Sequence, residues 1–505
     1  MMTYDPHGKH LIAGERIETA PKFQSSPATG MGFAVSTGSA EIVDKACVAA
    51  EAAFASLATT TREQRAQLLD AIAAQIEARD GDIVAIGCAE TGLPEARLQG
   101  ERGRTTGQLR LFATHIRDGS YLDRRHDKAL PNRKPLARPE LRMMQRPVGP
   151  VAVFGASNFP LAFSVAGGDT AAALAAGCPV VVKGHEAHPG TGEIVAEAIL
   201  AAITELGMDP GIFSLVQGGA HEVGAALVTH PLIKAVGLTG RLAGGRALYD
   251  LCAARRESIP FFGELGSVNP VFVLPQSATA RGTQIGAGWA ASLAMGAGQF
   301  CTNPGIAVVI DGPDADSFVQ AAAEGLGEVA AQTMLTEGVA ASFRDGAQRF
   351  ASAEGVRAHL GASCEGRSAL PHLFEISAQN WCANPALAEE VFGPLGLVIR
   401  VRDADEMETV ARAFAGQLTA TLQMDAGDID FARSLLPILE RMAGRVLANG
   451  FPTGVEVCDA MVHGGPYPAS TNFGATSVGT LSIRRFLRPV CYQNLPEGLL
   501  PADLH

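Results

Sequence analysis

The sequence lacks the cysteine pairs that a disulfide framework or a structural zinc site requires. Its nine cysteines are scattered and odd in number, and no Cys-x-x-Cys pair or Cys/His cluster has metal-ligand spacing. Unpaired cysteines are typical of a reducing compartment. We therefore expect no disulfide network and no bound metal.

Long apolar runs and an excess of positive charge are also missing. Apolar stretches such as 171–182 are interrupted by glycine and proline, and residues 1–5 do not begin a secretory signal. The net charge of −12 gives no overall attraction to nucleic acid or anionic lipid. Hydrophobic residues make up 47% of the chain and charged residues 18%. This composition predicts a soluble cytoplasmic enzyme of two or three domains, with no nucleic-acid or membrane partner.

A Gly-x-Gly-x-x-Gly fingerprint is absent, yet one region alternates strand-like and helix-like segments. Its β-branched runs end in glycine and are separated by alanine-rich segments; they are residues 148–155, 178–184, 213–218 and 234–240. Apolar strands that alternate with helices predict a doubly wound parallel sheet. Ligands of such sheets bind beyond the carboxyl ends of the strands.

A second α/β region is expected at about 261–444, with strand-like segments at 270–274 and 306–310. Before the first region, residues 124–146 contain eight basic residues, two acidic residues and three prolines. Such a segment could be a nucleic-acid or membrane arm. Without interleaved aromatic residues, and in an acidic chain, an exposed linker or edge hairpin is the preferred interpretation.

Two glycine-rich turns carry the residues with the clearest chemistry. Cys301 lies within 296–305 and Glu264 within 262–267. A thiol among small residues is accessible as a nucleophile, and a carboxylate can act as a general base. A cysteine hydrolase would use the same two groups, but the sequence places no histidine partner beside them.

Six motifs, in this order along the chain, resemble the aldehyde dehydrogenase superfamily over nearly its whole length. They lie at 157–160, 183–186, 238–241, 263–266, 298–301 and 389–394. The resemblance implies an α/β fold with two doubly wound parallel-sheet domains and a small oligomerisation element. The implied cofactor-binding domain comprises 1–123 and 147–260, with a return at 446–475; the catalytic domain is 261–445, and the oligomerisation element is 124–146 with 476–505.

The resemblance also implies a covalent reaction. Cys301, as the thiolate, would attack an aldehyde to form a thiohemiacetal. The side-chain amide of Asn158 and the backbone N–H of Cys301 would bind the oxyanion. Hydride transfer to a nicotinamide would leave a thioester, and Glu264 would activate the water that hydrolyses it.

The cofactor residues implied by the resemblance are Lys183, Glu186, Gly240, Arg241, Glu390 and Phe392. Lys183 and Glu186 would bind the adenine ribose, where a carboxylate accepts the 2′-hydroxyl of NAD and repels the 2′-phosphate of NADP. Glu390 would bind the nicotinamide ribose, with Phe392 packed nearby. Many relatives have serine where this chain has Arg241, whose guanidinium could strengthen pyrophosphate binding or reach a 2′-phosphate. We expect NAD to be preferred, with NADP as the alternative.

Three stretches, at 154–170, 298–305 and 449–458, resemble 2-oxoglutarate semialdehyde (2,5-dioxopentanoate) dehydrogenases in particular. An acidic substrate needs a local cation, and Arg104 lies on the segment that lines the aldehyde tunnel in relatives; Phe159 is expected beside it. Fatty or other aliphatic aldehyde oxidation, CoA-acylating dehydrogenation and a non-catalytic scaffold remain alternatives. The oligomerisation element implies a homodimer or homotetramer.

Overall fold

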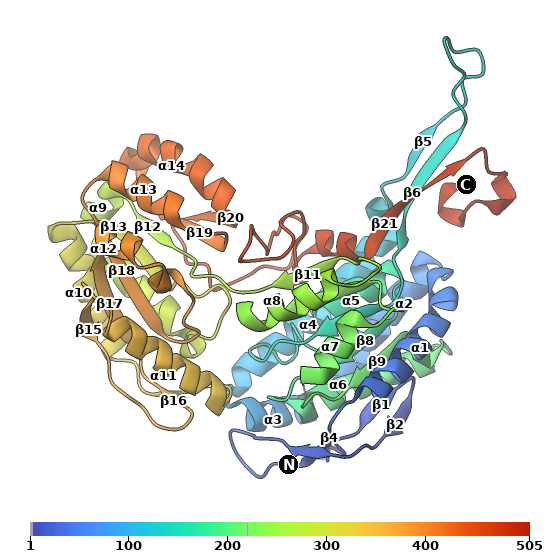
Figure 1. Ribbon diagram of the computed structural model, residues 1–505, viewed down its shortest axis with the longest axis horizontal. Coiled ribbons are helices and arrows are strands. Elements are labelled where there is room, and N and C mark those ends of the chain that lie inside the picture. Colours follow the sequence, from blue (N-terminus) through green and yellow to red (C-terminus); the bar gives the residue numbers. More distant parts are fainter. Residues whose placement is uncertain (1–3, 220) are drawn as a thin grey trace.

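The computed structural model describes residues 4–219 and 221–505, so residues 1–3 of the expected first domain lie outside it. Two lobes, each built on a seven-stranded sheet, dominate the molecule (Figure 1). The first sheet has the order β11 (Phe261–Glu264), β10 (Ala235–Thr239), β7 (Val151–Phe154), β8 (Val180–Lys183), β9 (Phe213–Val216), β1 (His10–Ile12) and β2 (Glu15–Ile17). All pairs among its first five strands are parallel. The runs predicted as strands are therefore confirmed.

Helices cover both faces of the first sheet, which is why its strands read as continuous apolar runs. Val151, Val153 and Val180 pack on one face, whereas Ala152 and Val181 pack on the other. The first face is covered by α2 (Arg62–Glu77), α3 (Asp80–Thr91), α4 (Glu95–Asp118), α5 (Gly168–Ala176) and α6 (Pro189–Glu205). The second face is covered by α1 (Ala40–Ala58), α7 (His221–Thr229) and α8 (Leu242–Ala253).

The second sheet repeats this arrangement. Its order is β15 (Arg357–Leu360), β17 (His372–Ser377), β18 (Leu395–Val401), β13 (Ile306–Ile310), β12 (Val271–Val273), β19 (Gln417–Gln423) and β20 (Ala443–Ala448). One face packs on α9 (Pro275–Ala294) and α10 (Pro313–Gly327). The other packs on α11 (Glu337–Ala351), α12 (Ala378–Ala383), α13 (Ala404–Ala413) and α14 (Ile429–Met442).

The change from one sheet to the other lies later than the expected boundary after residue 260. Strand β11, at Phe261–Glu264, pairs with β10 and so extends the first sheet. The second sheet begins only with β12 at Val271. Glu264 therefore projects from the carboxyl end of a first-sheet strand. The domain limits themselves stay a prediction.

A three-stranded antiparallel sheet projects as an arm from the first lobe (Figure 1). It contains β5 (Arg125–Asp127), β6 (Leu141–Pro147) and β21 (Leu487–Gln493), with β6 in the middle. The basic segment 124–146 is thus a hairpin, and the C-terminal tail supplies its third strand. Short two-stranded pairs complete the structure: β3 (Lys22–Gln24) with β4 (Ala34–Ser36), and β14 (Gln332–Thr333) with β16 (Ser368–Ala369). Within the described part of the chain, no helix has the length and apolar character needed to span a membrane.

Candidate active site

The turn before Cys301 has left-handed backbone at residues 296–298, directly after α9. Their φ angles are 56°, 56° and 65°, a region in which glycine is strain-free and other residues are uncommon. A Cβ added to Gly298 would lie 2.3 Å from the carbonyl carbon of Gly393, so close approach also requires glycine there. Beyond the turn, Asn269 donates Nδ2–H to the backbone oxygen of Cys301 at 2.8 Å. These contacts hold the cysteine backbone in one conformation.

Three side chains from distant parts of the sequence meet at this turn. Glu264 ends β11, and His463 lies on the irregular segment between β20 and the 3₁₀ turn η6 (Thr480–Phe486). His463 Nε2 lies 3.4 Å from Cys301 Sγ and 3.0 Å from Glu264 Oε1. The hydroxyl of Ser477 lies 2.6 Å from the other carboxylate oxygen, Oε2. The sequence placed no histidine beside the cysteine. The structure corrects this expectation, because the tertiary fold brings His463 next to Cys301.

Burial gives these groups unequal acidities. Burial and the adjacent charge of Glu264 raise the pKa of the Cys301 thiol well above its ordinary value. Burial also opposes ionisation of Glu264, but the proximity of His463 and the hydrogen bonds from His463 and Ser477 hold the pKa of this carboxyl below its usual range. The resting site therefore pairs a neutral thiol with an ionised carboxylate. A proton must leave the sulfur before it becomes a strong nucleophile.

Two cavities meet at Cys301. One, of about 630 Å³, is lined by Cys301, His463 and the predicted substrate residues Arg104 and Phe159. The other, of about 210 Å³, opens at the carboxyl ends of β7 and β10; its lining includes Cys301, Glu264, Asn158, Gly240, Arg241, Glu390 and Phe392. The thiol is thus reached from two sides, and most of the predicted site residues lie on one side or the other.

Asn158 contacts the loop that carries Cys301 and lines the smaller cavity with it. Its side chain is buried, and Nδ2 donates to the backbone oxygen of Gln299 at 3.0 Å. A carboxamide nitrogen has two hydrogens, so this contact orients the group and leaves a second N–H for a ligand. The structure therefore brings Asn158 next to the loop of Cys301, as expected.

In the larger cavity, Arg104 is only partly satisfied. Its Nη1 donates to the backbone oxygen of Val455 at 2.6 Å. Its Nε and Nη2 are buried without a hydrogen-bond partner among the described residues, and burial lowers the pKa of Arg104. Phe159 forms an edge contact with Phe163 at 5.1 Å between ring centroids. The cavity therefore combines aromatic walls with a cation that has hydrogen-bond donors without partners among the described residues.

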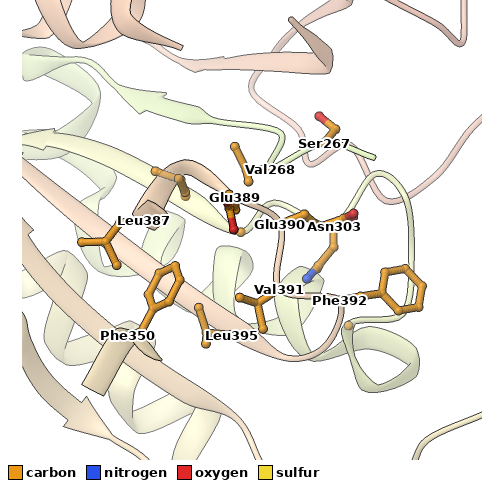
Figure 2. A pocket seen from close by; sticks show the side chains of 13 residues that line it. Ser267, Val268, Asn303, Phe350, Leu387, Glu389, Glu390, Val391, Phe392 and Leu395 are labelled. Carbon is orange, nitrogen blue, oxygen red and sulfur yellow. The ribbon is translucent and has the colours of Figure 1, made fainter. Parts of the chain in front are cut away.

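The predicted cofactor residues fall into two groups. Glu390 and Arg241 line the smaller cavity, and burial raises the pKa of the Glu390 carboxyl to about 8. Figure 2 shows Glu390 in the middle of its loop, with Phe392 on the opposite side from Phe350. Arg241 Nη1 donates to Ser342 Oγ at 3.2 Å, across to α11 of the second lobe.

Lys183 and Glu186 form the second group, outside the lining of that cavity. They lie at and just beyond the carboxyl end of β8, and Lys183 Nζ is 2.5 Å from Glu186 Oε1. The same oxygen accepts the backbone N–H of Gly219 at 2.8 Å. Burial opposes ionisation of Glu186, but the charges of Lys183 and His185 hold the pKa of its carboxyl below the usual range. Glu186 is therefore an anion near the end of β8, and its contact with the adenine ribose stays a prediction.

Sequence reasoning missed His463, Ser477 and Arg97. His463 is separated by 162 residues from Cys301 and by 199 from Glu264, so no local spacing signals it. Arg97 lies in the larger cavity, with its guanidinium carbon 4.4 Å from the ring centroid of Phe159. A helical heptad separates it from Arg104 on α4, so both could have been assigned to one face of that helix.

A free cysteine that lines two cavities, on a scaffold of two largely parallel α/β sheets, suits covalent catalysis by sulfur. The sequence pattern of the aldehyde dehydrogenase family matches residues 18–466, and the chain belongs to that family. The expected fold and the expected enzyme class are thereby confirmed. As a member of this family the protein is an oxidoreductase that acts on aldehydes with a nicotinamide cofactor.

Two relatives are similar over most of their length. Alpha-ketoglutaric semialdehyde dehydrogenase 2 of Azospirillum brasilense is 54% identical over 468 residues, which cover 92% of this chain and 88% of the relative. Alpha-ketoglutaric semialdehyde dehydrogenase of Acinetobacter baylyi is 49% identical over 502 residues, which cover 98% and 95%.

Solved structures of lower identity share the fold. A betaine aldehyde dehydrogenase from Staphylococcus aureus, in complex with NAD⁺, has a TM-score of 0.83 at 21% identity and covers 97% of each chain. The NADP-dependent glyceraldehyde-3-phosphate dehydrogenase from Bacillus halodurans, complexed with NADP, has a TM-score of 0.82 at 23% identity over 96% of this chain and 98% of that one.

Proposed function

We propose that the protein oxidises 2-oxoglutarate semialdehyde (2,5-dioxopentanoate) to 2-oxoglutarate, with NAD preferred over NADP. Both relatives described above carry the name of this activity. The observation that carries the proposal is Arg104, which lines the cavity that contains Cys301 and has two nitrogens, Nε and Nη2, without a hydrogen-bond partner among the described residues. A guanidinium with free donors matches a carboxylate in charge and geometry. Phe159 and its aromatic neighbours would pack against the substrate carbon chain.

The residues of the smaller cavity fit a nicotinamide dinucleotide. Glu390 packs so close to Gly266 that a Cβ there would lie 2.5 Å from its carboxylate oxygen. A carboxyl group in this position can accept ribose hydroxyls, and the backbone of Gly240 with the charge of Arg241 suits a pyrophosphate. When bound, the nicotinamide accepts a hydride. The anion Glu186, held by Lys183, favours a 2′-hydroxyl over a 2′-phosphate.

The chain's own residues would then act in a defined order. Cys301 Sγ attacks the aldehyde carbon while Asn158 Nδ2–H and the backbone N–H of Cys301 bind the oxyanion. Loss of hydride converts the thiohemiacetal to a thioester. Glu264 takes a proton from water, which attacks the thioester and releases the acid and the thiolate. Hydrolysis is favoured over transfer to CoA because this base stands next to the sulfur.

A panel of aldehydes tests the function. The purified protein is assayed with 2,5-dioxopentanoate, succinic semialdehyde, glutaraldehyde and hexanal, each with NAD and NADP, and with and without CoA. We expect the highest kcat/KM for 2,5-dioxopentanoate with NAD, and free 2-oxoglutarate as product. A higher kcat/KM for hexanal would reject the acidic substrate, and an acyl-CoA product would reject hydrolysis.

Assembly and location stay predictions of the sequence. We propose that the arm formed by β5, β6 and β21 mediates a homodimer or homotetramer, because its outer strands leave backbone groups free to pair with another chain. The nine free cysteines favour a cytoplasmic location. Light scattering of the protein with and without residues 487–505 tests the first point.

A further inference from the structure

We propose that His463 is a shared hydrogen-bond donor, whose Nε2–H is given to Glu264 in the resting site and to Cys301 once the sulfur is a thiolate. This inference deepens the proposed function and rests on it, because it concerns how the same nucleophile is generated. The geometry that carries it is a single nitrogen within reach of both groups, 3.0 Å from Oε1 and 3.4 Å from Sγ.

The resting contact fixes the tautomer of the imidazole. Glu264 is ionised, so an unprotonated nitrogen 3.0 Å from Oε1 would set two lone pairs against each other. Nε2 must therefore carry the hydrogen. Nδ1 is then a bare acceptor, which agrees with its having no hydrogen-bond partner among the described residues. The opposite tautomer would bury an unsatisfied N–H at Nδ1.

The histidine is held so that it cannot turn away. His463 is 1% exposed. Its backbone N–H donates to Thr476 Oγ1 at 2.8 Å, and its ring lies 6.2 Å from that of Phe163. The hydroxyl of Ser477 lies 3.0 Å from its backbone oxygen. A fixed ring is able to serve both neighbours without a conformational change.

The ring of His463 lies between acidic groups and near three arginines. Glu264 and Cys301 contact Nε2 directly, and Glu390 adds a further acidic group that acts on both. The nearby cations are Arg104 on α4, Arg445 on β20 and Arg485 on η6. Arg485 is paired with Asp169 at 2.7 Å, and so is not free to replace the histidine as a donor.

The proton transfer balances without a co-reactant. The S–H proton of Cys301 passes to Glu264, which becomes neutral as the sulfur becomes anionic. One unit of negative charge thus moves from Oε1 to Sγ. The hydrogen on Nε2 stays bonded to nitrogen, and its hydrogen bond changes acceptor from Oε1 to Sγ. After Sγ attacks the aldehyde carbon, Glu264 returns its proton to solvent and regains the hydrogen bond before it activates water. Without the donor, the Cys301 thiolate would lose its hydrogen bond from the ring, and Glu264 would keep only that from Ser477.

Two substitutions separate donation from proton acceptance. His463→Gln keeps an N–H near the position of Nε2 but cannot be protonated, whereas His463→Leu removes the donor with little loss of volume. The readout is the rate of Cys301 alkylation by iodoacetamide between pH 6 and 10, followed by mass spectrometry of its peptide, because other cysteines also react. Ser477→Ala is the matched control, since it removes a hydrogen bond from the same carboxylate on its other oxygen.

We expect His463→Leu to alkylate about tenfold to a hundredfold more slowly than the wild type at pH 7, with its pH midpoint displaced upward by about one to two units, one unit being a tenfold change in the thiolate equilibrium. His463→Gln should stay within about threefold of the wild type. A wild-type pH profile in His463→Leu would overturn the proposal. Equal losses in the two variants would also overturn it, since a proton-accepting histidine cannot be replaced by glutamine.

Two controls keep the outcome interpretable. Thermal unfolding and NADH binding by fluorescence report whether each variant is folded, and a third variant that also lacks a donor, His463→Met, is used if His463→Leu is not folded. Alkylation needs neither aldehyde nor hydride transfer. A protein whose thiol shows the expected pH shifts but which fails to oxidise 2,5-dioxopentanoate would therefore reject the proposed substrate and retain the role of His463.

Discussion

Replacing Arg104 by methionine should weaken the binding of an acidic aldehyde without affecting a neutral one. Methionine keeps the apolar stem and removes the guanidinium, whose Nε and Nη2 are the unpartnered donors in the cavity. A hydrogen bond to a charged group contributes about 1.5–3 kcal/mol. Each 1.4 kcal/mol is a factor of about ten, so the loss is about tenfold to a hundredfold. Because Arg104 is partly exposed, the lower half of this range is expected.

The assay compares kcat/KM for 2,5-dioxopentanoate and for hexanal in the wild type and in Arg104→Met. We expect the loss to appear in KM for the acidic aldehyde, with kcat nearly unchanged and hexanal oxidised at least as well as before. Arg110→Met is the matched control on the same helix, because Arg110 is exposed and pairs with Glu77 at 2.6 Å outside the cavity. Equal effects on both aldehydes would refute the carboxylate contact, as would a similar loss in Arg110→Met.

Four further predictions concern the general base, the thiol, the cofactor and the turn. Glu264→Gln should slow both the first turnover of NADH and the steady state, the latter by about a hundredfold, because Glu264 accepts the thiol proton and activates water; pre-steady-state kinetics measures the two separately, and an unchanged first turnover would contradict the transfer of the thiol proton to Glu264. Since the pKa of Cys301 is raised and the thiolate is the reactive form, the acylation rate should increase from pH 7 to pH 9; a flat profile would contradict this. Glu186→Gln should raise kcat/KM with NADP relative to NAD by about tenfold, measured with one aldehyde at saturation; an unchanged ratio would show that Glu186 does not discriminate. Gly298→Ala should lower the free energy of unfolding by about 3 kcal/mol or more, because the left-handed backbone and the approach of Gly393 leave no room for a Cβ; a wild-type melting temperature would contradict it.

The sequence alone predicted those strands and site residues whose positions depend on the local pattern of residues. Apolar runs ending in glycine predicted β7, β8, β9 and β10, because strands buried on both faces carry few polar residues. The glycine-rich turns predicted where Cys301 and Glu264 would lie on their own elements. The separation between these two groups was not readable, since it depends on how β11 docks on the first sheet while the cysteine turn follows α9 of the second lobe.

His463 shows why the rest could not be predicted. It lies in a segment without regular secondary structure, and its two contacts span 162 and 199 residues. No periodicity constrains such a segment; its path is fixed by tertiary hydrogen bonds, among them Thr476 Oγ1 to the backbone of His463. A single histidine before two glycines is as typical of a surface turn as of an active-site residue.

An acidic protein that binds an acidic substrate must reverse its charge locally, and the larger cavity does so. The chain carries a net charge of −12, but at physiological salt exposed charges are screened beyond about 8 Å. Within that distance of a bound carboxylate the relevant cations would be Arg104 and Arg97, which both line the cavity. Arg97 faces Glu101 at 3.6 Å and stacks over Phe159. Among the described residues its Nε has no hydrogen-bond partner, whereas Arg104 has two such nitrogens, Nε and Nη2. We therefore expect selectivity for an acidic aldehyde to depend mainly on Arg104, which has more nitrogens without a hydrogen-bond partner among the described residues, and less on the overall charge of the surface.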